Sequence, residues 1–170
     1  TPLPTNTPTP PDGLPTPTLD LGIPGAYCLP TNTPRLQGLV TRVLSGDMIE
    51  VLITNKTYRV RYIGVDAPSV LAPAEWQGAQ ALSFNQMLVQ GKNAILIQDA
   101  TDQDPDGAFP RYVLVDRVFV NYEMIRQGFG YSVSTPPDAS CSDSLLAAVV
   151  EAQREVRGLW MPTPVPTFTI

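Results

Sequence analysis

Residues 36–68 carry a run of Val, Ile, Leu, Thr and Tyr that is interrupted by two short polar breaks. The breaks, SGD at 45–47 and TNK at 54–56, consist of small and polar residues that favour tight turns. β-Branched and aromatic residues between turn signals are typical of strands. The pattern therefore predicts three antiparallel strands joined by tight turns.

The hydrophobic period changes to that of a helix over residues 74–90. Ala81, Phe84 and Leu88 are spaced to share one helix face, and Gly91 follows just past the end. This pattern predicts an amphipathic helix that stops at the glycine.

Two strand patterns and two helices complete this part of the chain. NAILIQDA and RYVLVDRVFV read as strands, and the second turns at 116–117. Asn121 is expected to cap a short helix that runs through Gln127 and ends at Gly128. A last helix is expected over about 143–157, because one apolar face is formed by Leu145, Val149, Ala152 and Val156. This order of elements suits a small β-barrel with helices packed on its outside.

The two ends of the chain have a different composition. Ten of the 19 prolines lie before Arg35, together with eight threonines and no Lys or Arg. Proline fixes φ and removes a backbone donor, so we expect an extended stalk or linker over 1–35 and a globular domain over 36–161. A Pro/Thr-rich tail covers 162–170. Its Val165, Phe168 and Ile170 alternate with threonines, a pattern with which the tail can add a strand to a neighbouring molecule.

Several features indicate an exported protein, extracellular or at the cell surface. Thr-Pro repeats suit O-glycosylated stalks, and Asn55 begins an Asn-Lys-Thr sequon. The candidate glycosylation sites are therefore Asn55 and the Thr-rich tails. Cys28 and Cys141 are expected to form an internal disulfide, although the sequence leaves an interchain bridge or two free thiols open.

The charge pattern disfavours an extended nucleic-acid interface. The formal net charge is −5, and basic residues never cluster beyond the pair Arg59 and Arg61. Binding to a phosphate backbone requires several basic contacts, although one local anion pocket stays possible. No apolar run approaches the roughly 18 residues of a membrane span, so none is expected.

Four motifs together resemble a known family. In order and spacing, VTRVLSGDMIEV, YRVRYIGVDAP, VFVNYEMIRQGFG and AQREVRGLW resemble the staphylococcal nuclease-like (thermonuclease) family over about residues 37–160. The resemblance implies an α+β fold, with a five-stranded OB-type barrel and three helices. It also implies a chemistry, because active members cleave phosphodiesters with one Ca²⁺, a carboxylate base and two arginines.

The resemblance assigns half of that site to residues that are present. Asp47 and Asp66 match the two carboxylate ligands of Ca²⁺, and the carbonyl of Ala67 matches the next ligand. Arg61, five residues before Asp66, matches the first phosphate arginine. These residues define an inherited metal site beside one retained arginine.

The other half departs from the family pattern. Ser69 stands where the base glutamate would be, and the chain has no histidine to activate its hydroxyl. Glu75 is expected to be a surface residue in the first turn of the helix, where an acid compensates the dipole, rather than a replacement base. Ala108 stands at the second arginine, and Arg111, three residues further on, is a possible substitute.

The loop around this missing arginine has a calcium-like pattern, DQDPDG. Carboxylates at alternate positions of a tight loop converge on one hard cation, so a second Ca²⁺ site is a candidate. The closing glutamate is missing, because position 113 is valine. The alternative is a solvated acidic turn. The candidate ligands are Asp102, Asp104, Asp106 and the carbonyl of Ala108.

Three functions are compatible with these observations. The leading prediction is an exported, catalytically inactive nuclease-fold domain that acts as a structural or binding module and self-assembles into an extracellular filament through its tails. The first alternative is a calcium-dependent phosphodiesterase with a rearranged active site. The second is a stalked cell-surface domain that binds a non-nucleic ligand.

Overall fold

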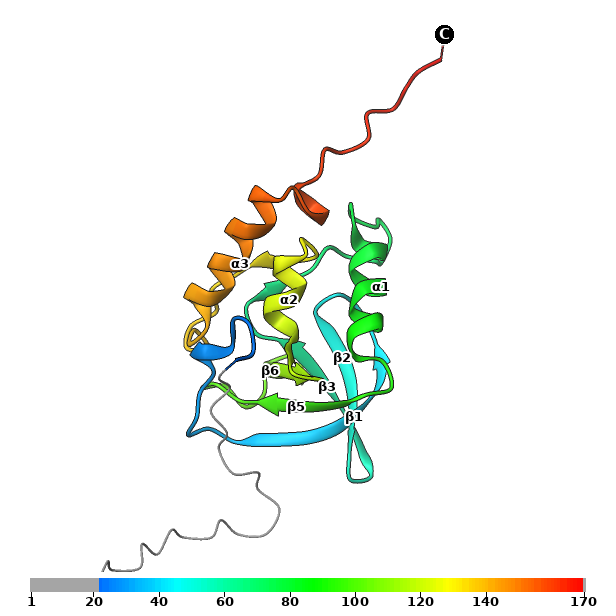
Figure 1. Cartoon of the computed structure of the whole chain (residues 1–170). Coiled ribbons are helices and arrows are strands. Elements are labelled where there is room, and N and C mark those ends of the chain that lie inside the picture. Colours follow the sequence, from blue (N-terminus) through cyan, green and yellow to red (C-terminus); the bar gives the residue numbers. More distant parts are fainter. Residues whose placement is uncertain (1–21, 170) are drawn as a thin grey trace, which may run out of the picture.

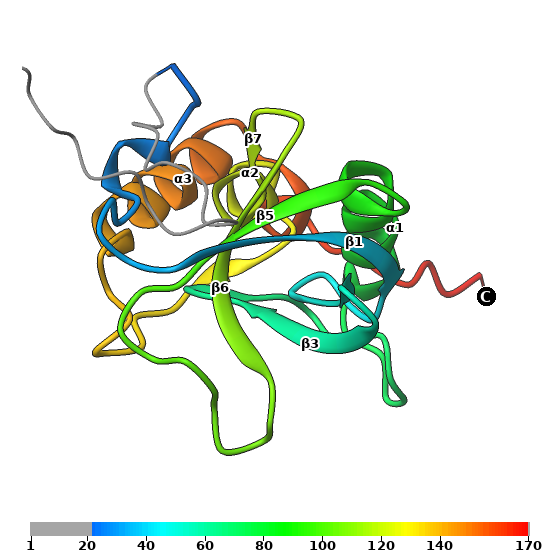
Figure 2. The same cartoon turned by 90° about the horizontal axis from the view of Figure 1, so that it is seen from below.

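A computed structural model describes residues 22–169. Within them, one sheet with the order β3-β2-β1-β5-β6-β7 is closed into a barrel by a parallel pairing of β3 with β6 (Figures 1 and 2). The five barrel strands are β1 (Arg35–Val43), β2 (Met48–Ile53), β3 (Lys56–Tyr62), β5 (Asn93–Ile97) and β6 (Phe109–Val115). The predicted α+β fold, a five-stranded OB-type barrel with three helices, is confirmed.

The predicted turns lie where the polar breaks placed them. Ile53 pairs with Lys56, so β2 and β3 are joined by a two-residue turn. Val115 likewise pairs with Val118 of β7 (Val118–Phe119), and both residues between them have a positive φ, as in the hairpin turns that match strand twist.

Three helices cover one end of the barrel: α1 (Gly78–Val89), α2 (Val120–Arg126) and α3 (Ser142–Arg154) (Figure 1). α1 starts at residue 78 rather than 74, because residues 69–77 form a loop and Gln77, its N-cap, has a left-handed φ of 67°. α3 ends before Val156, which is half exposed at a φ of 54° and therefore does not extend the apolar face.

The prediction that Asn121 caps α2 is wrong. Phe119 is the N-cap, and Asn121 lies inside the helix with a fully buried side chain. Its Oδ1 accepts from the Val113 N–H, while its Nδ2 donates to the carbonyls of Ile63 and Arg111. These contacts join backbone groups of β6 and of the corner after β3, although the Arg111 carbonyl also accepts from the Ile63 N–H at 3.0 Å.

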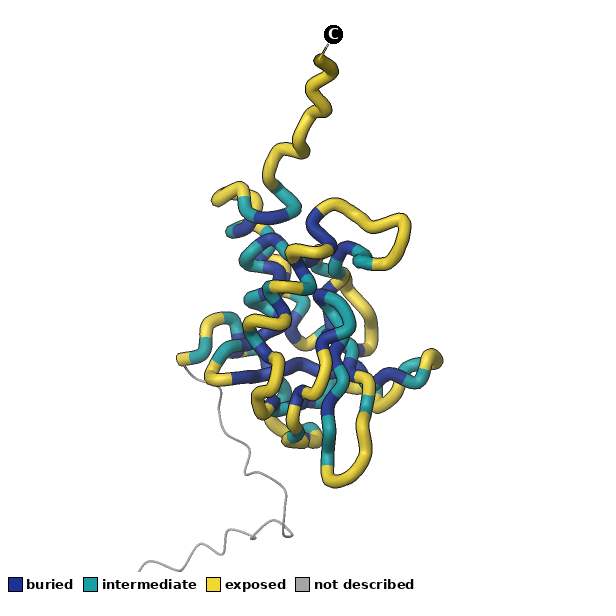
Figure 3. Tube along the Cα trace, turned by 90° about the vertical axis from the view of Figure 1, so that its right-hand side faces the viewer, coloured by how far each residue is buried: buried dark blue, intermediate teal, exposed yellow. Residues whose placement is uncertain are grey.

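The core fills the barrel and the interface with the helices (Figure 3). Fully buried strand residues include Val40, Ile49 and Val60, and they belong to one cluster with Met124 and Leu145 from the helices. At its edge, the Tyr62 hydroxyl donates to Asn85 Oδ1 at 2.7 Å, and burial raises the pKa of Tyr62.

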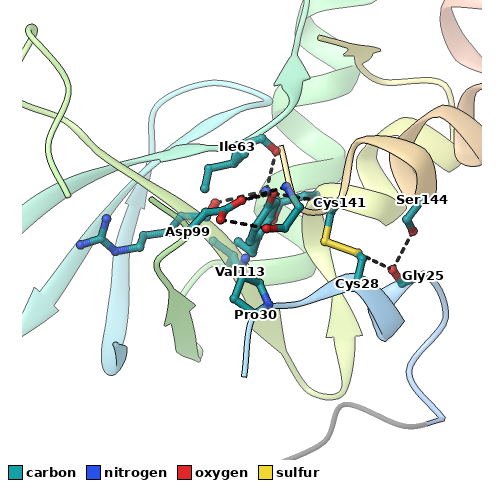
Figure 4. The surroundings of a disulfide bond; sticks show 12 residues. Gly25, Cys28, Pro30, Ile63, Asp99, Val113, Cys141 and Ser144 are labelled. Atoms are coloured by element: carbon teal, nitrogen blue, oxygen red, sulfur yellow. Dashed lines mark hydrogen bonds between the residues drawn. A yellow bond between two sulfur atoms is a disulfide. The ribbon is translucent and has the colours of Figure 1, made fainter. Parts of the chain in front are cut away.

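The segment before β1 is fastened to the domain. The predicted disulfide between Cys28 and Cys141 is present, and beside it the Ser144 hydroxyl donates to the Gly25 carbonyl at 2.7 Å (Figure 4). The boundary between stalk and domain after residue 35 stays a prediction from composition. Ala26 and Leu29 nevertheless pack in the core of the domain. The rest of the predicted stalk, 1–21, and Ile170 lie outside the described residues.

At the other end, the short 3₁₀ helix η2 (Gly158–Trp160) is followed by residues 161–169, which are exposed throughout (Figure 3). None of the helices formed by residues 22–169 has the length and apolarity to cross a membrane.

Candidate functional site

A cavity of about 400 Å³ opens at one side of the barrel. It lies between the corner that follows β3, the loop from β5 to β6, and residues 133–138. The loop from β5 to β6 extends well beyond the body of the barrel (Figure 2). Four carboxylates and one arginine line the cavity, together with apolar and proline side chains; the charged residues are Asp47, Asp66, Asp104, Asp138 and Arg61.

The corner of the cavity brings together the residues of the inherited metal site. Asp47, in the turn from β1 to β2, accepts from the Ser45 hydroxyl at 2.6 Å and from the Ala67 N–H at 3.1 Å. Asp66 ends β4 (Val65–Asp66), which pairs with β8 (Tyr131–Ser132). The turn can approach so closely because Gly46 has no side chain: a Cβ there would lie 2.7 Å from that of Ala67.

Negative charge is concentrated at this corner. Partial burial, followed by the neighbouring charges of Asp47 and Glu75, raises the pKa of Asp66 above its ordinary value of 3.8. A divalent cation would relieve this repulsion, and the two carboxylates with the Ala67 carbonyl are the hard oxygen donors that Ca²⁺ prefers. The donor set is small, because the described residues contain no group of three or more acidic, His or Cys side chains arranged to hold a metal.

Arg61, which the sequence analysis matched to a phosphate arginine of the family, is paired with acidic side chains. Its Nε donates to Asp104 Oδ2 at 3.0 Å, and its Nη2 lies 3.7 Å from Asp106 Oδ2. Arg59 donates to the Asp106 carbonyl at 2.6 Å. Both arginines of β3 therefore hold the acidic loop against the barrel.

Asp104 organises that loop. Its Oδ1 accepts from the N–H groups of Asp106 and Ala108, while its Oδ2 faces Arg61. Ala108, at the position of the second arginine, is fully buried. The loop is therefore folded around the Asp104 carboxylate, next to the position where the resemblance places an arginine.

Arg111 does not replace the missing arginine in this arrangement. Its guanidinium is buried, donates to Asp102 Oδ1 at 2.7 Å and to nearby backbone carbonyls, and does not line the cavity. The three carboxylates of the calcium-like pattern consequently have separate partners: Asp102 contacts Arg111, whereas Asp104 and Asp106 contact Arg61.

Glu75 is a surface residue, as expected, but it does not lie in the first turn of the helix. It lies in the 69–77 loop, before α1, and its Oε2 accepts from the Ser69 N–H at 2.5 Å. The Glu75 N–H in turn donates to the Ser69 carbonyl at 3.0 Å. A carboxylate thus lies beside the residue that replaces the base. Pro73, which lies between Pro68 and the helix, was the available signal that this segment forms a loop.

Two further residues complete the surroundings of the cavity. Tyr131 packs edge-on against Trp160 and does not line the cavity. Asp138, not recognised from the sequence, accepts from the N–H groups of Ala100 and Thr101 and fixes the start of the acidic loop. No motif identified it, because its partners lie far away in the chain.

The closed barrel, the Gly-Asp turn and the Asp-Ala-Pro corner define a nuclease-fold domain. The family model described as staphylococcal nuclease homologue matches residues 59–162. The thermonuclease of Staphylococcus intermedius is 27% identical over 125 residues, covering 72% of this chain and 74% of that protein. An uncharacterized endonuclease of Escherichia coli O157:H7 is 31% identical over 136 residues, covering 78% and 83%. The chain belongs to the staphylococcal nuclease homologue family.

Proposed function

We propose that this domain does not hydrolyse phosphodiesters and serves as a structural or binding module of an exported protein that self-associates through its ends. The observation that carries the catalytic part is the pairing of Arg61 with Asp104 and Asp106. The one arginine available to hold a phosphate is engaged by the loop that lacks the other arginine.

The energetics of the site support this proposal. Loss of a general base and loss of a transition-state arginine each typically cost about 10²–10⁴-fold in rate. A phosphate would also have to displace Asp104 from Arg61, although both oxygens of Asp104 are held by donors. The remaining carboxylates of the cavity repel an anion, and this repulsion is poorly screened in a recess.

Calcium is part of the proposal, on the basis of the family. Asp47, Asp66 and the Ala67 carbonyl would hold it, and in an active relative the metal would polarise a phosphate oxygen. In this chain its expected contribution is to stability, because it would neutralise the corner. The acidic loop stays a second candidate site; filling it would require Asp104 to exchange Arg61 for the metal.

The disulfide supports export, since such bonds persist in oxidising compartments. Asn55 is exposed in the turn between β2 and β3, as a glycosylation site has to be. Self-association rests on the exposed apolar side chains of residues 161–169.

The catalytic proposal is tested by restoring the family residues. With an oligonucleotide substrate and added Ca²⁺, the unmodified chain is expected to show no cleavage above buffer, whereas Ser69→Glu with Ala108→Arg should gain measurable cleavage. Adding Asp47→Ala to that double variant should abolish the gain. Because Ala108 is buried, each variant is first checked for a cooperative melting transition, and Ser69→Glu alone is assayed in parallel. Family-like cleavage by the unmodified chain would refute the proposal.

The alternative, a phosphodiesterase with a rearranged base, has one observation in its favour, the Glu75 carboxylate beside Ser69. This alternative predicts that the unmodified chain cleaves the substrate and that Glu75→Gln abolishes cleavage. Glu155→Gln, which changes an exposed glutamate at the end of α3, should keep it. Our proposal predicts no cleavage in any of the three proteins.

A further inference from the structure

Residues 161–169, which we call the Pro-Thr segment, present an uncharged apolar face. Met161 has φ −70° and ψ 150°, a polyproline II conformation, and proline recurs at every second position after it. A polyproline II helix has about three residues per turn, so one face is shared by Pro162, Val165 and Phe168. Val165 and Phe168 are 85% and 86% exposed, and no described residue covers them.

The exposed face of α1 forms a shallow, widely open groove with a volume of about 470 Å³. None of its lining residues is charged, and most of its exposed area is apolar; they are Ala79, Gln80, Ser83, Phe84 and Met87. Met87 is 64% exposed, whereas the Phe84 ring packs on the ring of Phe129, with the two ring centroids 5.0 Å apart. An anchored aromatic ring beside a flexible thioether is an adaptable surface for an apolar ligand.

The two surfaces match in length and in charge. Three residues of polyproline II span about 9 Å, which separates Val165 from Phe168. The groove runs over about two turns of helix, roughly 11 Å. Both surfaces are uncharged in a molecule whose formal charge is −5, so their contact desolvates no ionic group.

A second copy of the chain is the occupant that the geometry favours. In Figure 1 the Pro-Thr segment rises away from the end of the molecule where α1 begins, whereas α1 runs from that end in the opposite direction. To reach its own groove the segment would have to reverse, and prolines at 162, 164 and 166 stiffen it against a turn. We propose that the Pro-Thr segment of one copy docks its Val165 and Phe168 face into the α1 groove of a second copy.

This inference rests on the self-association in our proposed function and specifies its surface. The two partners use different surfaces, so a docked pair still has one free groove, on the copy that gave its segment, and one free segment, on the other copy. Such a contact propagates into an open chain of molecules unless it closes into a ring. Each contact is made by one short segment on a shallow groove, so we expect weak association that depends steeply on concentration.

Sedimentation velocity of the full 170-residue chain over a range of concentrations tests the contact. The unmodified chain should form species larger than a dimer as concentration rises. Phe168→Ser and Met87→Glu should each remain monomeric at concentrations at least tenfold higher. A mixture of these two variants should form a one-to-one pair and nothing larger, because Phe168→Ser retains the groove and Met87→Glu retains the segment.

Two matched changes control for surface apolarity. Leu71→Ser removes an apolar side chain that is 77% exposed, and Val150→Glu places a charge on α3 at a side chain that is 56% exposed. Both should assemble like the unmodified chain. Assembly that survives Phe168→Ser and Met87→Glu would overturn this docking mode and leave self-association standing. An unmodified chain that stays monomeric would overturn both, while the absence of nuclease activity is judged separately by cleavage.

Discussion

Arg61 retains the residue type that a phosphodiesterase site needs, but it has acquired different neighbours. Asp104 and Asp106 approach it from the loop in which Ala108 replaces an arginine. Where the resemblance places two arginines, position 108 is therefore alanine and Arg61 is paired with acids. We expect Arg61 to bind a phosphate only if these partners are displaced.

Substitution of Asp66 tests whether the negative charges of Asp47, Asp66 and Glu75 repel one another. The pKa of Asp66 is raised in the folded state, so its charged form destabilises the native protein, and stability falls as pH rises through that raised pKa. Asp66→Asn should therefore raise the melting temperature at pH 7 in the presence of a chelator. The gain should vanish below pH 3.8, the ordinary value for the carboxyl, because the native side chain is then neutral as well.

Calcium should reverse the order of these two proteins. At pH 7, added Ca²⁺ should raise the melting temperature of the unmodified chain more than that of Asp66→Asn. Glu155→Gln, a change of an exposed acid outside the site, serves as the control and should respond to Ca²⁺ like the unmodified chain. A melting temperature of Asp66→Asn below that of the unmodified chain in chelator would contradict the assignment of repulsion.

At the scale of elements, the strands were predicted more accurately than the helix ends. Alternating apolar residues and polar breaks are local signals, so the barrel strands and their turns follow from the sequence. The start of α1 depends instead on the 69–77 loop, in which Glu75 contacts the backbone of Ser69 across the loop. The end of α3 likewise depends on the packing of Gly158 against Gly128, whose backbones leave no room for a Cβ.

The stability effect of Asn121 distinguishes its predicted role as a helix cap from its observed role as a buried bridge between backbone groups. A helix cap typically contributes about 1 kcal/mol, whereas removing a buried amide that hydrogen-bonds to three backbone groups should cost about 2–4 kcal/mol. Asn121→Ala should therefore lower the free energy of unfolding by the larger amount in denaturant titrations. Asn93→Ala, at an exposed position, should change it by less than about 0.5 kcal/mol. Equal effects of the two changes would refute the bridging role of Asn121.

At the scale of the molecule, the disulfide joins the segment before the barrel to the start of α3 over 113 residues of sequence. Closing a loop of this size restricts the unfolded chain by roughly 4–5 kcal/mol in the chain-entropy model. Ala26 and Leu29, which lie close to Cys28 in the sequence, are packed in the core. The disulfide therefore also holds these native contacts in place.

Replacing both cysteines by serine should lower the free energy of unfolding by about 2–5 kcal/mol. A reducing agent should produce a similar loss in the unmodified chain and none in the double serine variant. Equal stability of the unmodified chain with and without the reducing agent, at confirmed thiol release, would contradict a stabilising role for the bridge.

The sequence by itself determined the order of the elements, the barrel, and which half of a phosphodiesterase site is present. These properties depend on local patterns and on residue identities at fixed spacing. Only the tertiary structure decided the partners of the side chains. It paired Arg61 with Asp104, buried Arg111 beside Asp102, and brought Glu75 to Ser69. Each of these contacts joins residues through a loop, and the path of a loop is fixed by packing rather than by periodicity.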